Sequence, residues 1–185
     1  SVQLNDLFGG CVSDDGASVA VVGRQKLEVW DPKTRQVIAT RVPKYHAFLG
    51  VTPLRAGGRF AVGEVRLVPD PKNPPESRHQ TEWIETGSVF LLGGEGWEVT
   101  AELDRPRVAF SGDGTAAVGY RARQPRDRDA GDYSVKVWRL GDGAAGAPTA
   151  LECRDPVWEA AVSDGGRFVF TAETSYARGW ELQPE

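Results

Sequence analysis

One pattern recurs along most of this chain: a short apolar run, a turn of Asp-Gly or Gly-Gly, a second apolar run, and a strand that ends in Trp. Three copies are clear, at residues 11–30, 109–138 and 161–180, and a degraded fourth copy lies between them. A repeated unit that cannot bury its own sheet must stack on its neighbours. The repeats therefore predict the blades of a β-propeller.

The turn residues align the four copies, because Gly supplies the positive φ that Asp-Gly and Gly-Gly hairpins require. Tight hairpins are expected at residues 12–16, 54–58, 110–114 and 162–166. Second strands are expected at 19–22, 60–62, 116–120 and 168–171, and third strands at 26–30, 88–92, 134–138 and 176–180. An ungapped alignment places Leu92 where the other third strands have Trp30, Trp138 and Trp180. Outer strands are expected at 36–40, 97–103 and 148–152.

The copies predict one all-β domain over residues 1–185, with blades at about 8–43, 47–103, 107–152 and 157–182. The fourth copy has no outer strand, whereas residues 1–7 form a spare one. We expect residues 1–7 to pair with residues 176–182, because a terminus that completes the last blade removes exposed strand edges. The four blades would then form a complete ring, one half of a ring made by two chains, or part of a larger propeller. The chain begins with Ser1 and contains no Met, which indicates an excised domain or a cleavage scar.

Composition argues against several classes of partner. The net charge of −4 and the pI near 5.3 give no broad field that would attract nucleic acid or an anionic membrane. No apolar stretch approaches the roughly 18 residues that span a bilayer, and no signal peptide is visible, so we expect a soluble, cytoplasmic protein. Cys11 and Cys153 make neither a disulfide framework nor a metal motif, and His46 and His79 stand apart from any Ser or Cys motif. No cofactor or metal is predicted.

The hairpin sequences Ser-Asp-Asp-Gly (13–16) and Ser-Gly-Asp-Gly (111–114) precede Leu-Glu-Val-Trp-Asp (27–31) and Val-Lys-Val-Trp-Arg (135–139). Together they resemble WD-repeat β-propellers, particularly divergent bacterial ones. Only Trp30-Asp31 has the family's dipeptide, since the other two copies read Trp138-Arg139 and Trp180-Glu181. The resemblance implies a rigid, non-catalytic scaffold that recognises a protein partner, as part of a larger protein or complex.

Two insertions, residues 69–86 and 121–132, both fall between the second and third strands of a blade and should emerge on the same face. In WD-repeat proteins this face is the commoner binding surface, and binding residues generally concentrate in loops on a rigid scaffold. The second insertion nets one positive charge, too little for a nucleic-acid groove, but its Arg side chains suit acidic segments of a protein partner. Each insertion could equally be a solvated excursion, and each Trp could pack within a blade. The candidate partner-binding residues are Arg78, Trp83, Arg121, Arg123, Arg126, Arg128, Tyr133 and Trp158.

The sequence is also compatible with two other functions. The first is an assembly module, whose ring is completed by a second chain or by further blades, or which is attached to an effector domain. The second is a hydrolase or lyase that uses Asp6, Asp104 and Asp155 at the mouth of the central channel. The neighbouring Arg105 and Pro156 favour turns and ion pairs at these carboxylates instead.

Overall fold

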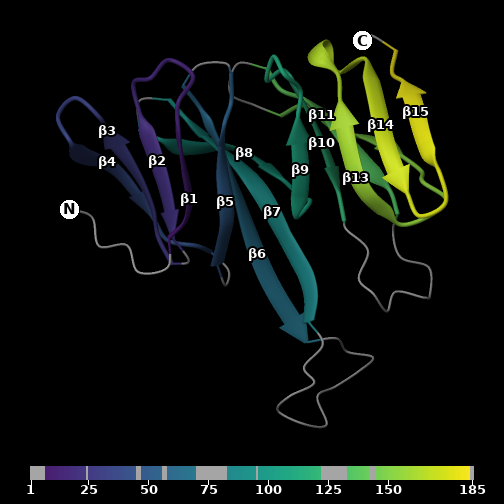
Figure 1. The fold of residues 1–185 in the computed structure, drawn as a ribbon, viewed down its shortest axis with the longest axis horizontal. Coiled ribbons are helices and arrows are strands. Elements are labelled where there is room, and N and C mark those ends of the chain that lie inside the picture. The colour runs from purple at the N-terminus through teal and green to yellow at the C-terminus, as the bar shows by residue number, and fades with distance from the viewer. Residues whose placement is uncertain are drawn as a thin grey trace.

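Four antiparallel β-sheets stand side by side in an arc, from β1–β4 at one end to β13–β15 at the other (Figure 1). The structure is a computed structural model that describes residues 7–23, 25–44, 47–55, 58–69, 83–94, 96–121, 133–141 and 145–183. The predicted all-β propeller architecture is confirmed, with one sheet for each repeat. In the described ranges, no helix is long and apolar enough to span a membrane.

Within each sheet the strand order follows the chain, so each sheet is a meander of hairpins. The first sheet contains β1 (Leu7–Val12), β2 (Val19–Gly23), β3 (Leu27–Asp31) and β4 (Gln36–Arg41). The second contains β5 (Ala47–Pro53), β6 (Phe60–Pro69), β7 (Trp83–Gly93) and β8 (Glu98–Leu103). The third contains β9 (Arg107–Phe110), β10 (Ala116–Tyr120), β11 (Val135–Arg139) and β12 (Thr149–Leu151). The fourth contains β13 (Val157–Val162), the 3-10 turn η1 (Asp164–Gly166), β14 (Phe168–Glu173) and β15 (Ala177–Glu181).

In the first and third sheets, the first hairpin forms where the sequence predicts it because a Ser side chain closes the turn. Ser111 Oγ donates to Asp113 Oδ1 at 2.6 Å, and the amide of Ala116 donates to Ser111 Oγ at 2.9 Å. Gly114 lies at a φ of +72°, which other residues rarely adopt. The hairpin after Ser13 has the same bonds. The Ser-x-Asp-Gly sequence therefore dictates both turns.

The strand pairing confirms the predicted equivalence of the third strands. In three sheets, the Trp that ends the repeat lies in the third strand opposite an equivalent residue of the second strand. In the second sheet, Leu92 occupies the place of this Trp. The four pairs are Val19–Trp30, Phe60–Leu92, Ala117–Trp138 and Val169–Trp180.

Successive sheets pack face to face. We call the face that contacts the next sheet in the chain the forward face, and the opposite one the rear face. Three apolar clusters fill the contacts between first and second, second and third, and third and fourth sheets. Their central residues are Ala20, Val22 and Val29 against Phe60, Val62 and Leu92; Ala61, Val89 and Leu91 against Ala117, Trp138 and Leu140; and Val118, Val135 and Val137 against Ala160, Val162 and Val169.

The hairpin between β6 and β7 is longer than the sequence indicated. The two strands pair from Phe60 opposite Leu92 to Pro69 opposite Trp83. The prediction that the insertion extends to residue 86 is therefore wrong, because residues 83–86 continue β7 and residues 63–69 continue β6. Figure 1 shows this hairpin reaching beyond the neighbouring sheets.

The predicted closure of the ring by the N-terminus falls mostly on residues 1–6, which lie outside the described residues. Leu7 pairs with Gly23 in the first sheet, so for this residue the predicted pairing with residues 176–182 is wrong. The reason is that β1 begins at Leu7 and continues as the inner strand of its own sheet.

Two carboxylates join the third and fourth sheets at their hairpin tips. Asp113 Oδ2 accepts a hydrogen bond from the amide of Gly165 at 2.8 Å, and Asp164 Oδ1 accepts one from the amide of Asp113 at 2.9 Å. Burial acts to raise the pKa of Asp113, but hydrogen bonds from Ser111, Thr115 and Gly165 outweigh it and hold that pKa far below its ordinary value.

We expect Trp138→Ala to lower the free energy of unfolding by roughly 3 to 5 kcal/mol, because truncating a buried aromatic side chain leaves a cavity. Trp138 is only 3% exposed, between the second and third sheets. Urea denaturation followed by circular dichroism measures the change. The matched control is Trp158→Ala, at a side chain 53% exposed, where we expect a loss of about 0.5 kcal/mol or less. Equal losses would contradict the assigned strand register.

We expect Asp113→Asn to be less stable than the parent chain at pH 7, with a difference that shrinks under acid conditions. The folded-state pKa of Asp113 lies below its unfolded value, so its bonds stabilise the fold above about pH 4 and are lost as the pH falls further through the folded-state pKa. Denaturation curves at neutral pH and at acid pH give the two differences. A difference that stays constant would show that this carboxylate does not stabilise the folded state as an anion.

Candidate functional site

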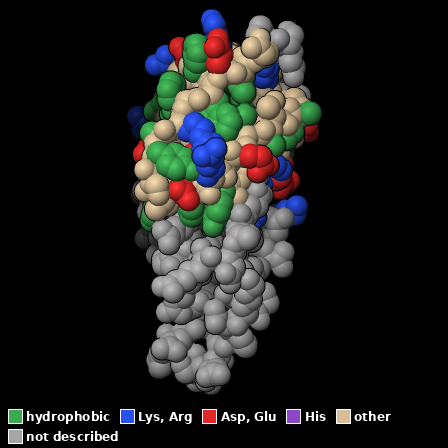
Figure 2. Space-filling model, turned by 90° about the vertical axis from the view of Figure 1, so that its right-hand side faces the viewer, with side chains coloured by type: hydrophobic (Ala, Val, Ile, Leu, Met, Phe, Trp, Pro, Cys, Tyr) green, Lys and Arg blue, Asp and Glu red, His purple; other side chains and the backbone are tan. Residues whose placement is uncertain are grey.

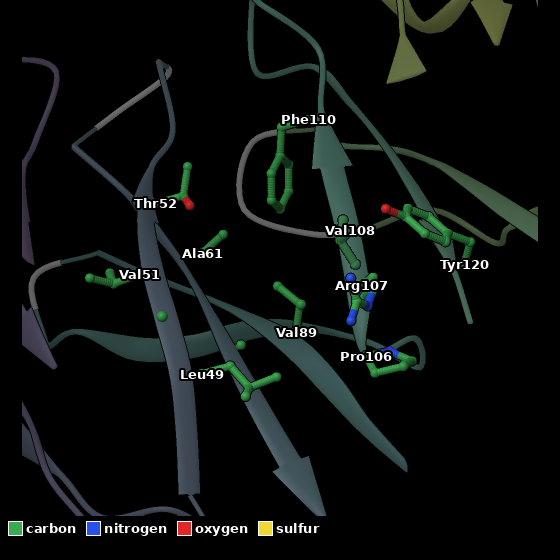
Figure 3. Close-up of a pocket in the computed structure, with 12 residues that line it drawn as sticks. Leu49, Val51, Thr52, Ala61, Val89, Pro106, Arg107, Val108, Phe110 and Tyr120 are labelled. Carbon is green, nitrogen blue, oxygen red and sulfur yellow. The ribbon is translucent and has the colours of Figure 1, made fainter. Parts of the chain in front are cut away.

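A groove opens between the inner strands of the second and third sheets. β5 lies against β1 and β9 lies against β13, but a cavity of about 350 Å³ separates β5 and β6 from β9. Figure 3 shows this cavity, with Leu49 and Val89 on one side and Val108 and Phe110 on the other. A neighbouring cavity of about 300 Å³ shares Thr52, Val108 and Phe110 with it. We call the two together the inner groove.

Two glycines of the second sheet create this space. Gly50 pairs with Gly63 across β5 and β6, at the position where Arg107 pairs with Tyr120 across β9 and β10. A Cβ atom added at Gly50 would meet nothing within 4 Å, and one at Gly63 would meet only the Leu49 Cβ at 3.5 Å. The third sheet therefore carries two large side chains where the second sheet carries none, and the missing side chains leave the groove.

The groove is mainly apolar but has a cation and hydroxyl groups along its wall. Arg107 and Tyr120 lie at one end, and Thr52 lies farther along (Figure 3). Burial raises the pKa of the Tyr120 phenol, the charge and hydrogen bond of Arg107 act against this rise, and Glu159 adds to it. Because the net pKa of Tyr120 is raised, its hydroxyl stays protonated at neutral pH and can donate a hydrogen bond.

Bulges in two inner strands turn apolar side chains outward. The register shifts between Phe48 and Gly50 in β5, and between Val157 and Glu159 in β13. The extra residues of these bulges, which pair with no residue of the neighbouring strand, are Leu49 and Trp158. Their exposed fractions are 47% and 53%. A bulge re-aims the side chain of its extra residue, so both side chains are available for contact. For Trp158, exposure favours the surface interpretation over packing within a blade.

The structure describes some of the predicted binding residues and not others. Arg121 is exposed and directly follows Tyr120 of the inner groove, and Tyr133 lies just before β11 at the same end of the third sheet. Trp83 begins β7, but its side chain is not described. Four predicted residues lie outside the described residues: Arg78, Arg123, Arg126 and Arg128. Figure 1 shows the described ends of the β6–β7 and β10–β11 hairpins on one side of the arc.

Among the carboxylates of the hydrolase or lyase alternative, that of Asp104 is held by neighbouring cations, and the backbone of Asp155 is held by a glutamate. Asp104 forms ion pairs with Lys136 and Arg105, and the amide of Asp155 donates to Glu173 Oε2 at 3.1 Å. Within the part of the chain that the structure describes, no group of three or more His, Cys, Asp or Glu side chains could hold a metal ion. The remaining candidates lie outside the described residues: Asp6, His46 and His79.

Both cysteines are partly buried and pack against the apolar clusters, Cys11 between the first and second sheets and Cys153 between the third and fourth. Burial raises the pKa of each thiol to about 11. At neutral pH both thiols are therefore protonated and weakly nucleophilic. Both cysteines thus behave as small apolar residues.

Neither Arg107 nor Tyr120 stands out in the sequence as a binding residue. The strand register places Gly50 and Gly63 where the third sheet has Arg107 and Tyr120. The hairpin alignment of 54–58 with 110–114 is one residue off and puts them opposite Pro106 and Gly119, so it does not give this signal. Two glycines opposite each other on one face of a sheet leave a space only if another sheet packs on that face. The packing of the third sheet on the second must therefore be known before the groove can be inferred.

No family model and no curated protein matches this chain by sequence. Solved structures match its fold: a chain of the mitotic checkpoint complex (TM-score 0.57, 14% identity), the β-propeller domain of Myceliophteria thermophila Cps50 (Swd1) (0.55, 11%) and U3-55K (0.55, 14%). These matches cover 96%, 96% and 98% of this chain, but 51%, 54% and 50% of the other chains. The fold is thus that of WD40 β-propellers, and this chain spans about half the length of the propeller chains it matches.

Proposed function

We propose that this chain is a non-catalytic binding module that recognises an extended segment of a protein partner in the inner groove. WD40 propellers are typically protein-interaction scaffolds, and one of the matched chains comes from a multiprotein complex. A fold alone does not define a function, so the proposal rests on the site. The observation that carries it is the open space that the Gly50–Gly63 pair leaves beside Arg107 and Tyr120.

The lining of the groove defines the chemistry of the segment. Leu49, Val108 and Phe110 offer apolar walls that suit an aliphatic or aromatic side chain. The Arg107 guanidinium suits a carboxylate, and the Tyr120 hydroxyl can donate to the same group. The expected ligand is therefore a segment in which an apolar residue lies close to Asp or Glu.

The backbone supports an extended conformation of this segment. β5 and β9 are the edge strands of their sheets, and the groove lies between them. An edge strand has unpaired amide and carbonyl groups that can pair with an added strand. Backbone pairing would supply affinity, and the side-chain pocket beside it would supply specificity.

The outer part of the partner would contact the face that carries the two insertions, residues 70–82 and 121–132. Arg121 and Tyr133 lie at the same end of the third sheet as Arg107 and Tyr120, so one partner can touch both regions. Trp158 follows at the corresponding end of the fourth sheet. The predicted residues Arg78, Trp83, Arg123, Arg126 and Arg128 belong to this outer contact in our proposal.

Selection from a random peptide library tests the groove. We expect enrichment of peptides that combine an apolar residue with Asp or Glu, and we expect Gly50→Val to weaken them by about tenfold or more, because the new side chain occupies the space they need. Arg107→Glu should remove the preference for acidic peptides. Affinities are measured by isothermal titration, and melting temperatures confirm that each variant folds.

The matched control is Gly9→Val, since Gly9 has the same place in β1 and a Cβ there also meets nothing within 4 Å. This variant should bind the selected peptides as the parent chain does. Unchanged affinity in Gly50→Val, or a library that yields no enriched peptide, would refute the groove as the binding site.

We expect deletion of residues 121–132 to weaken partner binding while the thermal transition stays nearly unchanged. The reason is that this insertion follows the end of β10, precedes β11 and is not part of a predicted strand. Calorimetry and titration of the same sample give both quantities. Loss of the folded state would instead show that the insertion is structural.

A further inference from the structure

The arc of four sheets ends in two faces that no described sheet covers. One is the forward face of the fourth sheet, which presents Phe168 and Phe170 with 38% and 57% of their surface exposed. The corresponding residues of the third sheet, Ala116 and Val118, are fully buried by the fourth sheet. Figure 2 looks onto this end of the molecule and shows hydrophobic side chains spread over its described part, with charged side chains among them.

The other open face is the rear face of the first sheet. A single cross-strand row of apolar residues runs over all four of its strands. The row consists of Val12, Val19, Trp30 and Val37. Val12 and Val37 are 53% and 41% exposed, whereas Val162 and Val169, in the same row of the fourth sheet, are 9% and 0% exposed. The first sheet therefore has the residues of a buried rear face, with no described sheet over them.

The forward face of the fourth sheet has the volume of a packing surface, although β15 contributes only Ala177, Gly179 and the charged Glu181 to it. Phe170 lies opposite Gly179, where the third sheet pairs Val118 with Val137. A Cβ atom at Gly179 would lie 3.2 Å from the Phe170 ring, so this ring covers the glycine. One large and one very small residue thus replace two of medium size. Such compensation is expected of a face that packs against another sheet.

At one corner of the forward face, where the second strand begins and the third strand ends, arginines form hydrogen bonds to the next sheet. Arg59 donates to the carbonyl of Gly141 at 3.2 Å, and Arg139 donates to the carbonyl of Gln183 at 3.4 Å. Both acceptors lie two residues after the end of a third strand, β11 or β15. In the fourth sheet, Arg167 lies at this corner, paired with Glu181, and is 64% exposed.

The first sheet has the matching acceptor position. Two residues after the end of β3 lies Lys33, next to the turn that the Asp31 carboxylate caps by accepting a hydrogen bond from the Lys33 amide at 2.7 Å. The rear face of the first sheet thus combines an apolar row with a backbone carbonyl, at Lys33, in the position that accepts from an arginine in the third and fourth sheets. These features match the forward face of the fourth sheet in apolar pattern and in the arginine beside it.

From this match we infer that two copies of the chain close into one ring, in which the forward face of each fourth sheet packs on the rear face of the partner's first sheet. The contact repeats the geometry that the chain already uses three times between its own sheets. Contacts between unlike faces form a closed assembly when the rotation between the copies closes the ring. The inference is independent of what the inner groove binds.

Native mass spectrometry and light scattering of the 185-residue chain test this assembly. We expect a particle of about 40 kDa, twice the 20.1 kDa of one chain. Phe170→Asp alters one open face and Val12→Arg alters the other, so each variant alone should be monomeric. Both residues are more than half exposed, and circular dichroism checks that the β-sheet signal is retained. If a charged variant loses that signal, Phe170→Ser or Val12→Ser replaces it.

Mixing the two variants separates this ring from other dimers. One of the two contacts in the mixed dimer has both faces unaltered, and the other sets Asp against Arg, so the mixture should regain the mass of about 40 kDa. A parent chain that stays monomeric at micromolar concentration would overturn the inference. So would a dimer that only one of the two variants disrupts, or that neither disrupts, because the contact would then use other faces.

Discussion

The contact of one sheet face with the next determines the rest of this structure. A four-stranded sheet of this size has two apolar faces, and neither can be buried by its own strands. The clusters around Leu92, Trp138 and Val169 bury one rear face after another, and each is covered by the forward face of the preceding sheet. The arc, the inner strands along its concave side and the exposed faces at its two ends all follow from this stacking.

The inner groove is a local exception to the same rule. Between the third and fourth sheets, Tyr120 helps to fill the contact, whereas the Gly50–Gly63 pair leaves the contact between the second and third sheets open near the inner strands. A protein that omits side chains from a contact loses packing energy there. This loss is understandable if a partner segment supplies the missing atoms, which is the function we propose.

Much of the fold could be predicted from the sequence because its signals are local. Gly114 and the Ser-Asp pair before it specify a hairpin within a few residues, and the apolar alternation that ends in Trp138 specifies a strand. The length of β6 and β7 could not be predicted, since residues 63–69 and 83–86 extend a hairpin whose pairing depends on both strands at once. The groove could not be predicted either, because Gly50 and Arg107 gain their meaning only when neighbouring sheets are placed against each other. Of the predicted site, Trp158 was accessible to sequence reasoning as an aromatic residue outside the repeated Trp position.

The central claim is that both faces of each sheet, including the two faces at the ends of the arc, are buried by another sheet. Small-angle X-ray scattering of the 185-residue chain tests this claim most directly. The account predicts the scattering of a flat, closed ring with the mass of two chains. Scattering from a single-chain arc, with both end faces left in water, would contradict it.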